Sequence, residues 1–233
     1  NIIFLSSSRV YSIDQLKKLI KKVNLNHPIK SKKLIDEKFE TGSASSLYGY
    51  TKFSSEKLIK EMLYKKKLKY LINRFGVIAG PWQFGKQDQG FVPLWVASHF
   101  LKRKLSYIGF GGNGYQVRDV IHIDDVSTAT HLIAEQGTLG DCYHIATSST
   151  VTIRQLVELI CQTMSANFDE VCQVTDDRKG KDAAYLLNTE KLRNELAWTD
   201  KISLEQGLAS TIAWARDNIA SLSQQPLDYI HKP

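Results

Sequence analysis

Apolar segments of strand length alternate with segments of helix length along most of this chain. The strand-like segments are IIFLSS, KYLINRFGVIAG, LSYIG, QVRDVIHI and DCYHIAT. The helix-like segments cover residues 12–22, 48–67, 90–103, 124–136, 152–164 and 203–219. This alternation predicts an α/β protein whose sheet is mostly parallel. Residues 24–46 are expected to form an irregular loop, and the polar tail from Ser221 is expected to be loosely held.

Length, hydrophobicity and cysteine usage narrow the class of protein. The 233 residues allow one large domain or two small ones, and 42% hydrophobic residues can form a core. No run of about 18 apolar residues occurs, so no membrane span is expected, and the first residues lack the charged flank of a signal peptide. The cysteines form no CxxC pair, and the histidines show no metal-ligand spacing. We therefore expect a cytoplasmic protein with reduced cysteines and no metal site.

The chain is basic, with 31 Lys and Arg against 24 Asp and Glu and a net charge of +7. Nucleic-acid binding must therefore be considered. The lysines cluster on expected helix faces and loops, which favours solvated surfaces over a nucleic-acid site. A positive charge also suits an anionic small ligand. We expect neither a nucleic acid nor a membrane as a partner.

Residues 109–114, GFGGNG, match the G-x-G-x-x-G pattern of dinucleotide-binding loops. Such a loop must follow a strand and open a helix, whose N-terminus receives the pyrophosphate. The residues after it, YQVRDVIHI, indicate a strand instead. We therefore expect residues 109–114 to form a loop between strands, outside any nicotinamide pocket.

The segment SSLYGYTKF places two tyrosines near a lysine. Tyr48 and Lys52 are four residues apart and would share a helix face, whereas Tyr50, two residues from the lysine, would not. A lysine ammonium beside a tyrosine favours the phenolate. Such a tyrosine can take a proton from an alcohol while a hydride leaves the same carbon. The alternative is an amphipathic helix without chemistry, because this spacing alone is common.

The order of several motifs resembles the extended short-chain dehydrogenase/reductase superfamily, which includes the NAD-dependent nucleotide-sugar epimerases and dehydratases. These motifs are SSSRVY, Y-x-x-x-K, NRFGVIAGP, QVRDVIHIDDV, DRKGKD and LLNTEKLRNELAW, and they cover nearly the whole chain. The segments WQFGKQDQGFV and GYQVRDVIH are similar to the CDP-tyvelose (CDP-paratose) 2-epimerase branch.

This resemblance implies roles for five residues. Tyr48 is expected to be the general acid/base, Lys52 to hold the nicotinamide ribose, and Ser7 to bind the reacting sugar oxygen. Arg118 and Arg178 are expected to clamp the nucleotide diphosphate, a task that suits the permanently charged fork of arginine. The alternatives are a strand-edge ion pair for Arg118 and an exposed loop charge for Arg178. The resemblance also places Phe75 at the cofactor, together with Tyr48 and Lys52. It places Val77 and Gln89 at the substrate.

The chain departs from the family pattern at three places. Val77 stands where many members have asparagine, which puts one substrate contact in doubt. Ser8 and Arg9 stand where the 4,6-dehydratases have Asp and Glu, so elimination of water lacks obvious proton carriers. The family also begins with a strand, a G-x-x-G-x-x-G loop and a helix, whereas this chain begins at the SSS strand. We therefore expect that an N-terminal cofactor-binding portion is absent and that the first strand has an uncovered apolar flank.

The expected fold is α/β, with the C-terminal part of a Rossmann-like, doubly wound parallel sheet and a smaller mixed α/β substrate-binding domain. Residues 1–85 and 116–147 are assigned to the NAD-binding domain, and residues 86–115 and 148–233 to the nucleotide-sugar portion.

The expected function is that of an NAD-dependent nucleotide-sugar epimerase, which oxidises a sugar carbinol and returns the hydride to the opposite face. C2 of a CDP-dideoxyhexose is the favoured position. The alternatives are a 4-epimerase or reductase acting on a UDP- or dTDP-sugar, and a non-catalytic nucleotide-sugar binding module. The long helix from Tyr48 resembles one that pairs in family homodimers, so a homodimer is expected.

Overall fold

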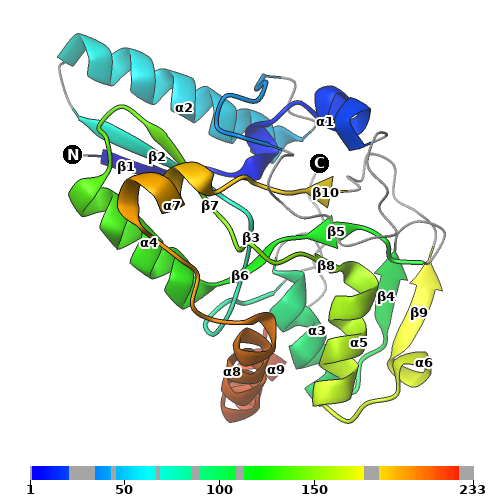
Figure 1. Cartoon of the computed structure of the whole chain (residues 1–233). Coiled ribbons are helices and arrows are strands. Elements are labelled where there is room, and N and C mark those ends of the chain that lie inside the picture. Colours follow the sequence, from blue (N-terminus) through cyan, green and yellow to red (C-terminus); the bar gives the residue numbers. More distant parts are fainter. Residues whose placement is uncertain are drawn as a thin grey trace.

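The predicted alternation of strands and helices is confirmed in the computed structural model (Figure 1). The structure describes residues 2–20, 35–42, 46–66, 69–85, 90–108, 113–175 and 184–225. Its first sheet is parallel, with the order β1-β2-β7, and consists of β1 (Ile2–Leu5), β2 (Tyr70–Phe75) and β7 (Cys142–Ile145).

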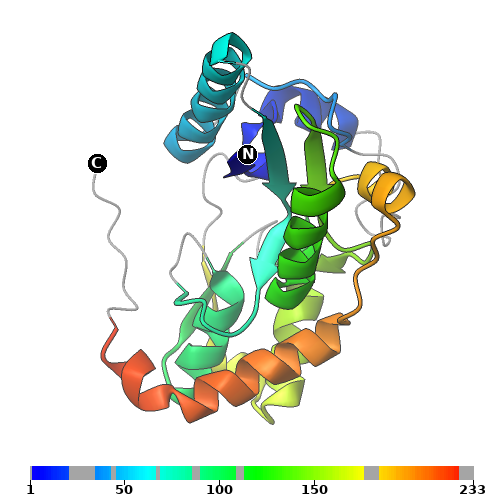
Figure 2. The same ribbon diagram turned by 90° about the vertical axis from the view of Figure 1, so that its left-hand side faces the viewer.

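Helices cover both faces of this first sheet. Helix α2 (Leu47–Lys66) lies on one side, and α4 (Ile123–Gln136) and α7 (Glu190–Leu196) lie on the other (Figures 1 and 2). Strand β2 is in the middle of the sheet and is buried along almost its whole length. Burial on both faces is the usual environment of a parallel strand between helical layers, and it accounts for the apolar sequence of this segment.

Two segments that were each predicted to be one strand are divided between separate sheets. Residues 69–80 form β2 and β3 (Val77–Ala79), with Gly76 between them. Residues 116–123 form β5 (Val117–Arg118) and β6 (Val120–His122), with Asp119 between them. Strand β3 pairs with β6, whereas β5 pairs with β10 (Ala184–Tyr185) and β8 (Val151–Thr152). The prediction of two continuous strands was therefore wrong.

The buried carboxylate of Asp119 explains this division. Its Oδ2 accepts a hydrogen bond from the Leu187 backbone N at 3.1 Å, and its Oδ1 accepts one from the Val77 backbone N at 3.4 Å. A Cβ atom on Gly76 would lie 2.7 Å from Asp119 Oδ1, so only glycine leaves room for the carboxylate. The side chain thus binds the backbone of two other segments at the break between β5 and β6, in addition to the bond that the Val77 backbone N makes to the Asp119 carbonyl oxygen at 3.2 Å. Burial raises the pKa of Asp119 to about 7.

In the second half of the fold, β4 (Leu105–Ile108) and β9 (Cys172–Thr175) form a separate parallel pair. Capping boxes begin two helices: Thr152 with Gln155 caps α5 (Ile153–Thr163), and Ser203 with Gln206 caps α8 (Leu204–Asp217). The elements outside the first sheet are η1 (Ser8–Val10), α1 (Ile13–Ile20), α3 (Phe91–Phe100), β4 (Leu105–Ile108), α5 (Ile153–Thr163), α6 (Phe168–Val171), β9 (Cys172–Thr175), α8 (Leu204–Asp217) and α9 (Ile219–Ser223).

The C-terminal tail starts later than the sequence indicated. Residues 221–223 belong to α9, and the Leu222 side chain is buried in a hydrophobic cluster with α3, α5 and α8. The prediction that the chain is loosely held from Ser221 was therefore wrong for these residues. Two apolar residues of this short helix, the buried Leu222 and the partly buried Ile219, pack on that cluster.

A chain of buried polar side chains crosses the face of the first sheet that α2 covers. Glu56 of α2 accepts two hydrogen bonds from Arg74 of β2, from Nε to Oε1 at 2.9 Å and from Nη2 to Oε2 at 2.6 Å. The Ser6 hydroxyl donates to the same Oε1 at 2.5 Å. Burial acts against the charge of Arg74, but its hydrogen bonds to Glu56 raise its pKa above the ordinary value. This ion pair joins α2, β2 and the end of β1.

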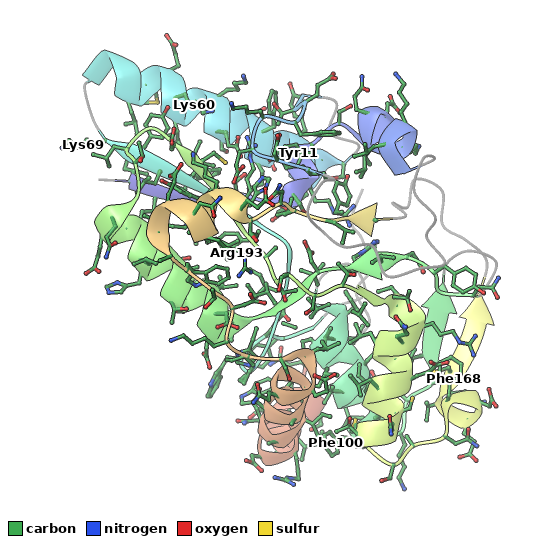
Figure 3. The ribbon with its side chains drawn as sticks, viewed as in Figure 1. Tyr11, Lys60, Lys69, Phe100, Phe168 and Arg193 are labelled. Atoms are coloured by element: carbon green, nitrogen blue, oxygen red, sulfur yellow. The ribbon has the colours of Figure 1, made fainter. Side chains whose placement is uncertain are left out.

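The same chain continues through Tyr11 to His144 (Figure 3 labels Tyr11). Arg74 Nη1 donates to the Tyr11 hydroxyl at 2.7 Å, and that hydroxyl lies 2.5 Å from His144 Nε2. His144 Nδ1 lies 2.9 Å from the Asn188 carbonyl oxygen, which can only accept, so Nδ1 carries the proton. Burial, with a smaller effect of Arg74, lowers the pKa of His144 to about 3. The imidazole is therefore neutral, and Tyr11 donates to Nε2.

None of the helices in the described part of the chain combines the length and apolarity that crossing a membrane requires. The described residues also contain no group of three metal-ligating side chains, and Cys142, Cys161 and Cys172 are free thiols.

Replacing Asp119 by alanine should lower the free energy of unfolding. The Leu187 amide would lose a buried acceptor, at a cost of about 1–3 kcal/mol for a group left unsatisfied, whereas the Val77 amide keeps its bond to the backbone carbonyl oxygen of residue 119. Urea denaturation measures the change. Asp217→Ala, which alters an exposed carboxylate, is the control and should have little effect. An Asp119→Ala variant as stable as the wild type would contradict the role given to this carboxylate.

Acid should destabilise the fold through His144. The unfolded chain binds a proton on this residue with a pKa of about 6.5, whereas the folded protein resists protonation until about pH 3. Stability is therefore complete above about pH 6.5 and is lost as the pH falls towards the folded pKa. Urea denaturation at a series of pH values should show this loss in the wild type and a smaller one in His144→Gln.

The exposed His131 provides the control for this pH dependence, since His131→Gln should behave as the wild type does. Glu37 also faces His144, and burial raises its pKa, which gives a contribution of the opposite sign. Comparing variants isolates the contribution of the histidine. Equal acid dependence in the wild type and His144→Gln would refute the neutral-imidazole assignment.

Candidate functional site

The candidate site begins where β1 ends. Ser7 follows this strand and caps the short helix η1, and its Oγ accepts a hydrogen bond from the Arg9 backbone N at 3.2 Å. The adjacent Ser6 is held by the buried carboxylate of Glu56. Parallel α/β sheets bind ligands beyond the carboxyl ends of their strands, and Ser7 lies at such an end. Its hydroxyl can still donate a hydrogen bond to a substrate oxygen.

Helix α2 contacts η1 and presents Tyr48 and Lys52 at the end of the same strand. Lys52 Nζ donates to the Leu5 carbonyl oxygen at 2.8 Å, and it lies 5.9 Å from the centroid of the Tyr48 ring. It also lies 5.2 Å from the centroid of the Phe4 ring. Tyr48 and Lys52 therefore share one helix face, as their spacing predicted, and Tyr48 is 42% exposed.

The anchoring of α2 fixes these two residues relative to β1. Glu56 lies one helical turn after Lys52 and is tied to Ser6 and Arg74. Lys52 itself is tied to Leu5. Two successive turns of the helix are thus bound to successive residues at the end of one strand. This places a phenol, an ammonium and the Ser7 hydroxyl around one edge of the sheet.

The other predicted site residues occupy different positions. Phe75 is buried at the end of β2 in a hydrophobic cluster, and Val77 is half-buried at the start of β3. Arg118 ends β5, and its Nη1 donates to the Val117 carbonyl oxygen at 2.8 Å. Gln89 and Arg178 lie outside the described residues, as do residues 109–112 of the glycine-rich segment. The roles assigned to all these residues stay predictions.

The sequence contained signals for the supporting residues that the motif search did not use. Glu56 follows Lys52 by four residues and so continues the helix face of Tyr48 and Lys52. Arg74 interrupts an apolar strand, and a charge in such a position needs a buried partner. Tyr11 and His144 carry no comparable signal, because their contact depends on the packing of three separate segments.

Tyr185, a further residue at this edge, was not identified from the sequence. It is buried in β10, and the Arg9 guanidinium carbon lies 5.1 Å from the centroid of its ring. In the parallel pairing of β10 with β5, Tyr185 is opposite Arg118. Two-residue strands such as β10 leave no detectable periodicity.

Several curated proteins are similar to this chain in sequence. Among curated relatives, the dTDP-glucose 4,6-dehydratase of Streptomyces antibioticus is 32% identical over 176 residues, which cover 76% of this chain and 50% of the relative. The enzyme of that name from Mycobacterium tuberculosis (strain ATCC 25618 / H37Rv) is 30% identical over 175 residues, with 75% and 51% covered. The chain spans about half the length of the curated relatives it matches.

Solved structures show the same fold. A dTDP-glucose 4,6-dehydratase from Streptomyces venezuelae, with NAD bound, has a TM-score of 0.78 and 24% identity, covering 94% of this chain and 61% of that one. A UDP-glucose 4-epimerase from Thermotoga maritima, with UDP-glucose, has a TM-score of 0.76 and 24% identity, covering 93% and 63%. These likenesses confirm the Rossmann-like α/β fold class.

The model of the NAD dependent epimerase/dehydratase family matches residues 1–146, which is more than half of the chain. The matched range includes Ser7, Tyr48 and Lys52. The chain therefore belongs to the NAD-dependent epimerase/dehydratase family.

Proposed function

We propose that this chain carries the acid/base centre of an NAD-dependent nucleotide-sugar epimerase. The observation that carries the proposal is the placement of Tyr48 and Lys52 on one helix face, bound through Lys52 to the end of the strand that leads to Ser7. Tyr48 would take the proton from a sugar hydroxyl, and Ser7 would bind the same oxygen. After the ketosugar has turned, Tyr48 would return the proton.

The residues of the site fit the nicotinamide end of NAD. An ammonium has three donors, and Lys52 uses one of them on the Leu5 carbonyl, so it can also bind ribose hydroxyls. When bound, NAD would supply the hydride acceptor and donor. Tyr48 and Lys52 would orient its ribose, and Phe75 is proposed to contact it. Among described residues, we identify no glycine-rich loop leading into a helix that could hold the pyrophosphate.

The residues after Ser7 favour epimerisation over dehydration. Ser8 is buried, and Arg9 is exposed with its guanidinium over Tyr185. Neither side chain can exchange a proton as a carboxylic acid does, since serine is too weak an acid and arginine stays protonated. The 4,6-dehydratases resembled by this chain carry Asp and Glu at these positions. Similarity to the dehydratases in sequence and fold therefore does not imply that this chain has dehydratase activity.

The identity of the substrate is a finer part of the proposal. We favour C2 of a CDP-dideoxyhexose, on the resemblance of the WQFGKQDQGFV segment, with Val77, Gln89, Arg118 and Arg178 at the substrate. A 4-epimerase acting on UDP- or dTDP-sugars is the second candidate, because a UDP-glucose 4-epimerase shares the fold. A reductase and a non-catalytic nucleotide-sugar binding module are the remaining alternatives.

We also propose that α2 pairs with α2 of a second copy in a homodimer. Several apolar side chains of this helix are exposed, which suits a helix-pairing surface. They are Leu47, Tyr50, Leu58 and Met62. We propose the division into two parts as well. Residues 1–85 and 116–147 would form the NAD-binding part, residues 86–115 and 148–233 the nucleotide-sugar part, and the nucleotide sugar would lie between them.

Mass spectrometry of the ligands released by denaturing the purified protein tests the proposed function. We expect NAD and a nucleotide sugar, since a tightly held cofactor must return its hydride to the same molecule. Product analysis by NMR then distinguishes inversion at one sugar carbon from loss of water. A protein that binds nucleotide sugar, lacks NAD and leaves the sugar unchanged when NAD is added would establish the binding module instead.

Replacing Tyr48 by phenylalanine should leave the fold intact and lower the turnover rate by at least about 10²-fold, because only the proton carrier is lost. The rate of sugar inversion by NMR measures this effect. Tyr50→Phe is the matched control, since it removes the same hydroxyl from a different helix face. Greater sensitivity at Tyr50 than at Tyr48 would overturn the acid/base assignment.

A further inference from the structure

Three successive residues at the end of β1 contact helix α2. The Ser6 hydroxyl donates a hydrogen bond to Glu56. The Leu5 carbonyl oxygen accepts one from Lys52 Nζ at 2.8 Å, and the centroid of the Phe4 ring lies 5.2 Å from the same Nζ atom. Side chains alternate between the two faces of a strand, so those of Phe4 and Ser6 point towards the face that α2 covers. The strand end thus holds the lysine through a carbonyl group and an aromatic ring.

The ammonium of Lys52 lies over two aromatic rings. Its Nζ atom is 5.2 Å from the centroid of the Phe4 ring and 5.9 Å from that of the Tyr48 ring. An ammonium within about 6 Å of a ring centroid, over the face of the ring, is attracted by the negative charge of that face. Because one ring belongs to β1 and the other to α2, the two rings hold the ammonium at the point where strand and helix meet.

The groups that hold this ammonium carry no net charge. In the part of the chain that the structure describes, Lys52 forms no ion pair with a carboxylate, and its hydrogen-bond acceptor is the Leu5 carbonyl oxygen. A carboxylate would hold the ammonium more strongly, but its opposite charge would cancel much of the field that the ammonium exerts on Tyr48. A ring face and a carbonyl oxygen instead orient the ammonium and leave its positive charge available to the phenol and to a bound ligand.

We infer that Phe4 is a positioning residue for the proposed reaction. Its ring fixes the Lys52 ammonium between strand and helix, where the ammonium can act on Tyr48 and bind the ribose of a nicotinamide cofactor. The inference rests on the proposed function, because the proposed chemistry is what gives Lys52 its task. Since Phe4 acts through Lys52, the loss of its ring should change the rate of turnover more than the affinity for the substrate.

Replacing Phe4 by leucine tests the inference, because leucine keeps an apolar side chain and removes the ring. We expect kcat for nucleotide-sugar inversion to fall about three- to tenfold, which is the size expected when one cation–π contact is lost. KM for the nucleotide sugar should change less than about twofold. Phe4→Tyr keeps the ring and should stay near the wild-type rate. Thermal melting of each variant checks that the fold is retained.

Phe100→Leu is the matched control, because it makes the same substitution in α3. There Phe100 packs on a hydrophobic cluster in the second half of the fold (Figure 3 labels this residue). This variant should have the wild-type kcat at temperatures below its melting transition.

NMR of protein labelled with carbon-13 at its lysines gives a measurement that does not depend on activity. The ε-methylene protons of Lys52 should resonate upfield, because the ring currents of Phe4 and Tyr48 shield nuclei over the ring faces. The signal is assigned by its absence from Lys52→Met. It should move downfield in Phe4→Leu and keep its position in Phe4→Tyr. An unchanged signal in Phe4→Leu would contradict the contact.

The kinetic outcomes separate this inference from the proposed function. Wild-type kcat in Phe4→Leu, together with an inactive Tyr48→Phe, overturns the inference and leaves the proposed function standing. An equal loss of kcat in Phe4→Leu and Phe4→Tyr, or in Phe4→Leu and Phe100→Leu, also overturns it. A wild-type protein that inverts no nucleotide sugar overturns the proposed function and the inference with it. If Phe4→Leu fails to fold, Phe4→Met decides by the same comparison.

Discussion

The buried ion pair between Glu56 and Arg74 is the interaction on which the arrangement of the site depends. Burying two charges costs several kcal/mol for each ion, so such a pair is retained only when its hydrogen bonds are well made. Here both carboxylate oxygens accept from the guanidinium, the Ser6 hydroxyl donates to the carboxylate, and Tyr11 accepts from the remaining guanidinium arm. Removing one partner would leave the other charged and buried, which typically costs about 3–5 kcal/mol. The pair therefore contributes geometry more than net stability.

That geometry reaches the site through α2. Lys52 is one turn before Glu56, and its bond to the Leu5 carbonyl closes a second connection between helix and strand. A catalytic group must be held within about 0.5 Å of its working position, which a helix with two anchors achieves better than a loop. The neutral His144 extends the same hydrogen bonds to the Asn188 carbonyl, and so links the first sheet to the segment that leads into α7. Because His144 Nδ1 faces a carbonyl oxygen and the Tyr11 hydroxyl accepts from Arg74, the donors and acceptors of this chain have one consistent assignment.

Sequence patterns predicted the structural features that depend on local sequence. They failed for the features that depend on tertiary contacts. The shared face of Tyr48 and Lys52 follows from their spacing, and the two capping boxes follow from residue type. The division of two strands at Gly76 and Asp119 could not be predicted, because a carboxylate from one segment binds the backbone of two others. Strands of two residues and the helix anchored by Leu222 are likewise products of packing. The roles of Gln89 and Arg178 rest on resemblance alone.

The reaction is decided by few residues on this scaffold. A dehydratase and a 4-epimerase match the chain with nearly equal TM-scores, 0.78 and 0.76, so the fold does not select between their chemistries. What differs must lie in side chains that contact the sugar. The buried chain from Ser6 to His144 faces the interior and cannot distinguish substrates. Ser8 and Arg9 follow the strand end directly, and they replace two proton carriers by a buried hydroxyl and a fixed cation. With Tyr48 as the proposed proton carrier, the site would support oxidation and reduction of one carbinol at a bound nicotinamide, whereas elimination of water would require further proton carriers.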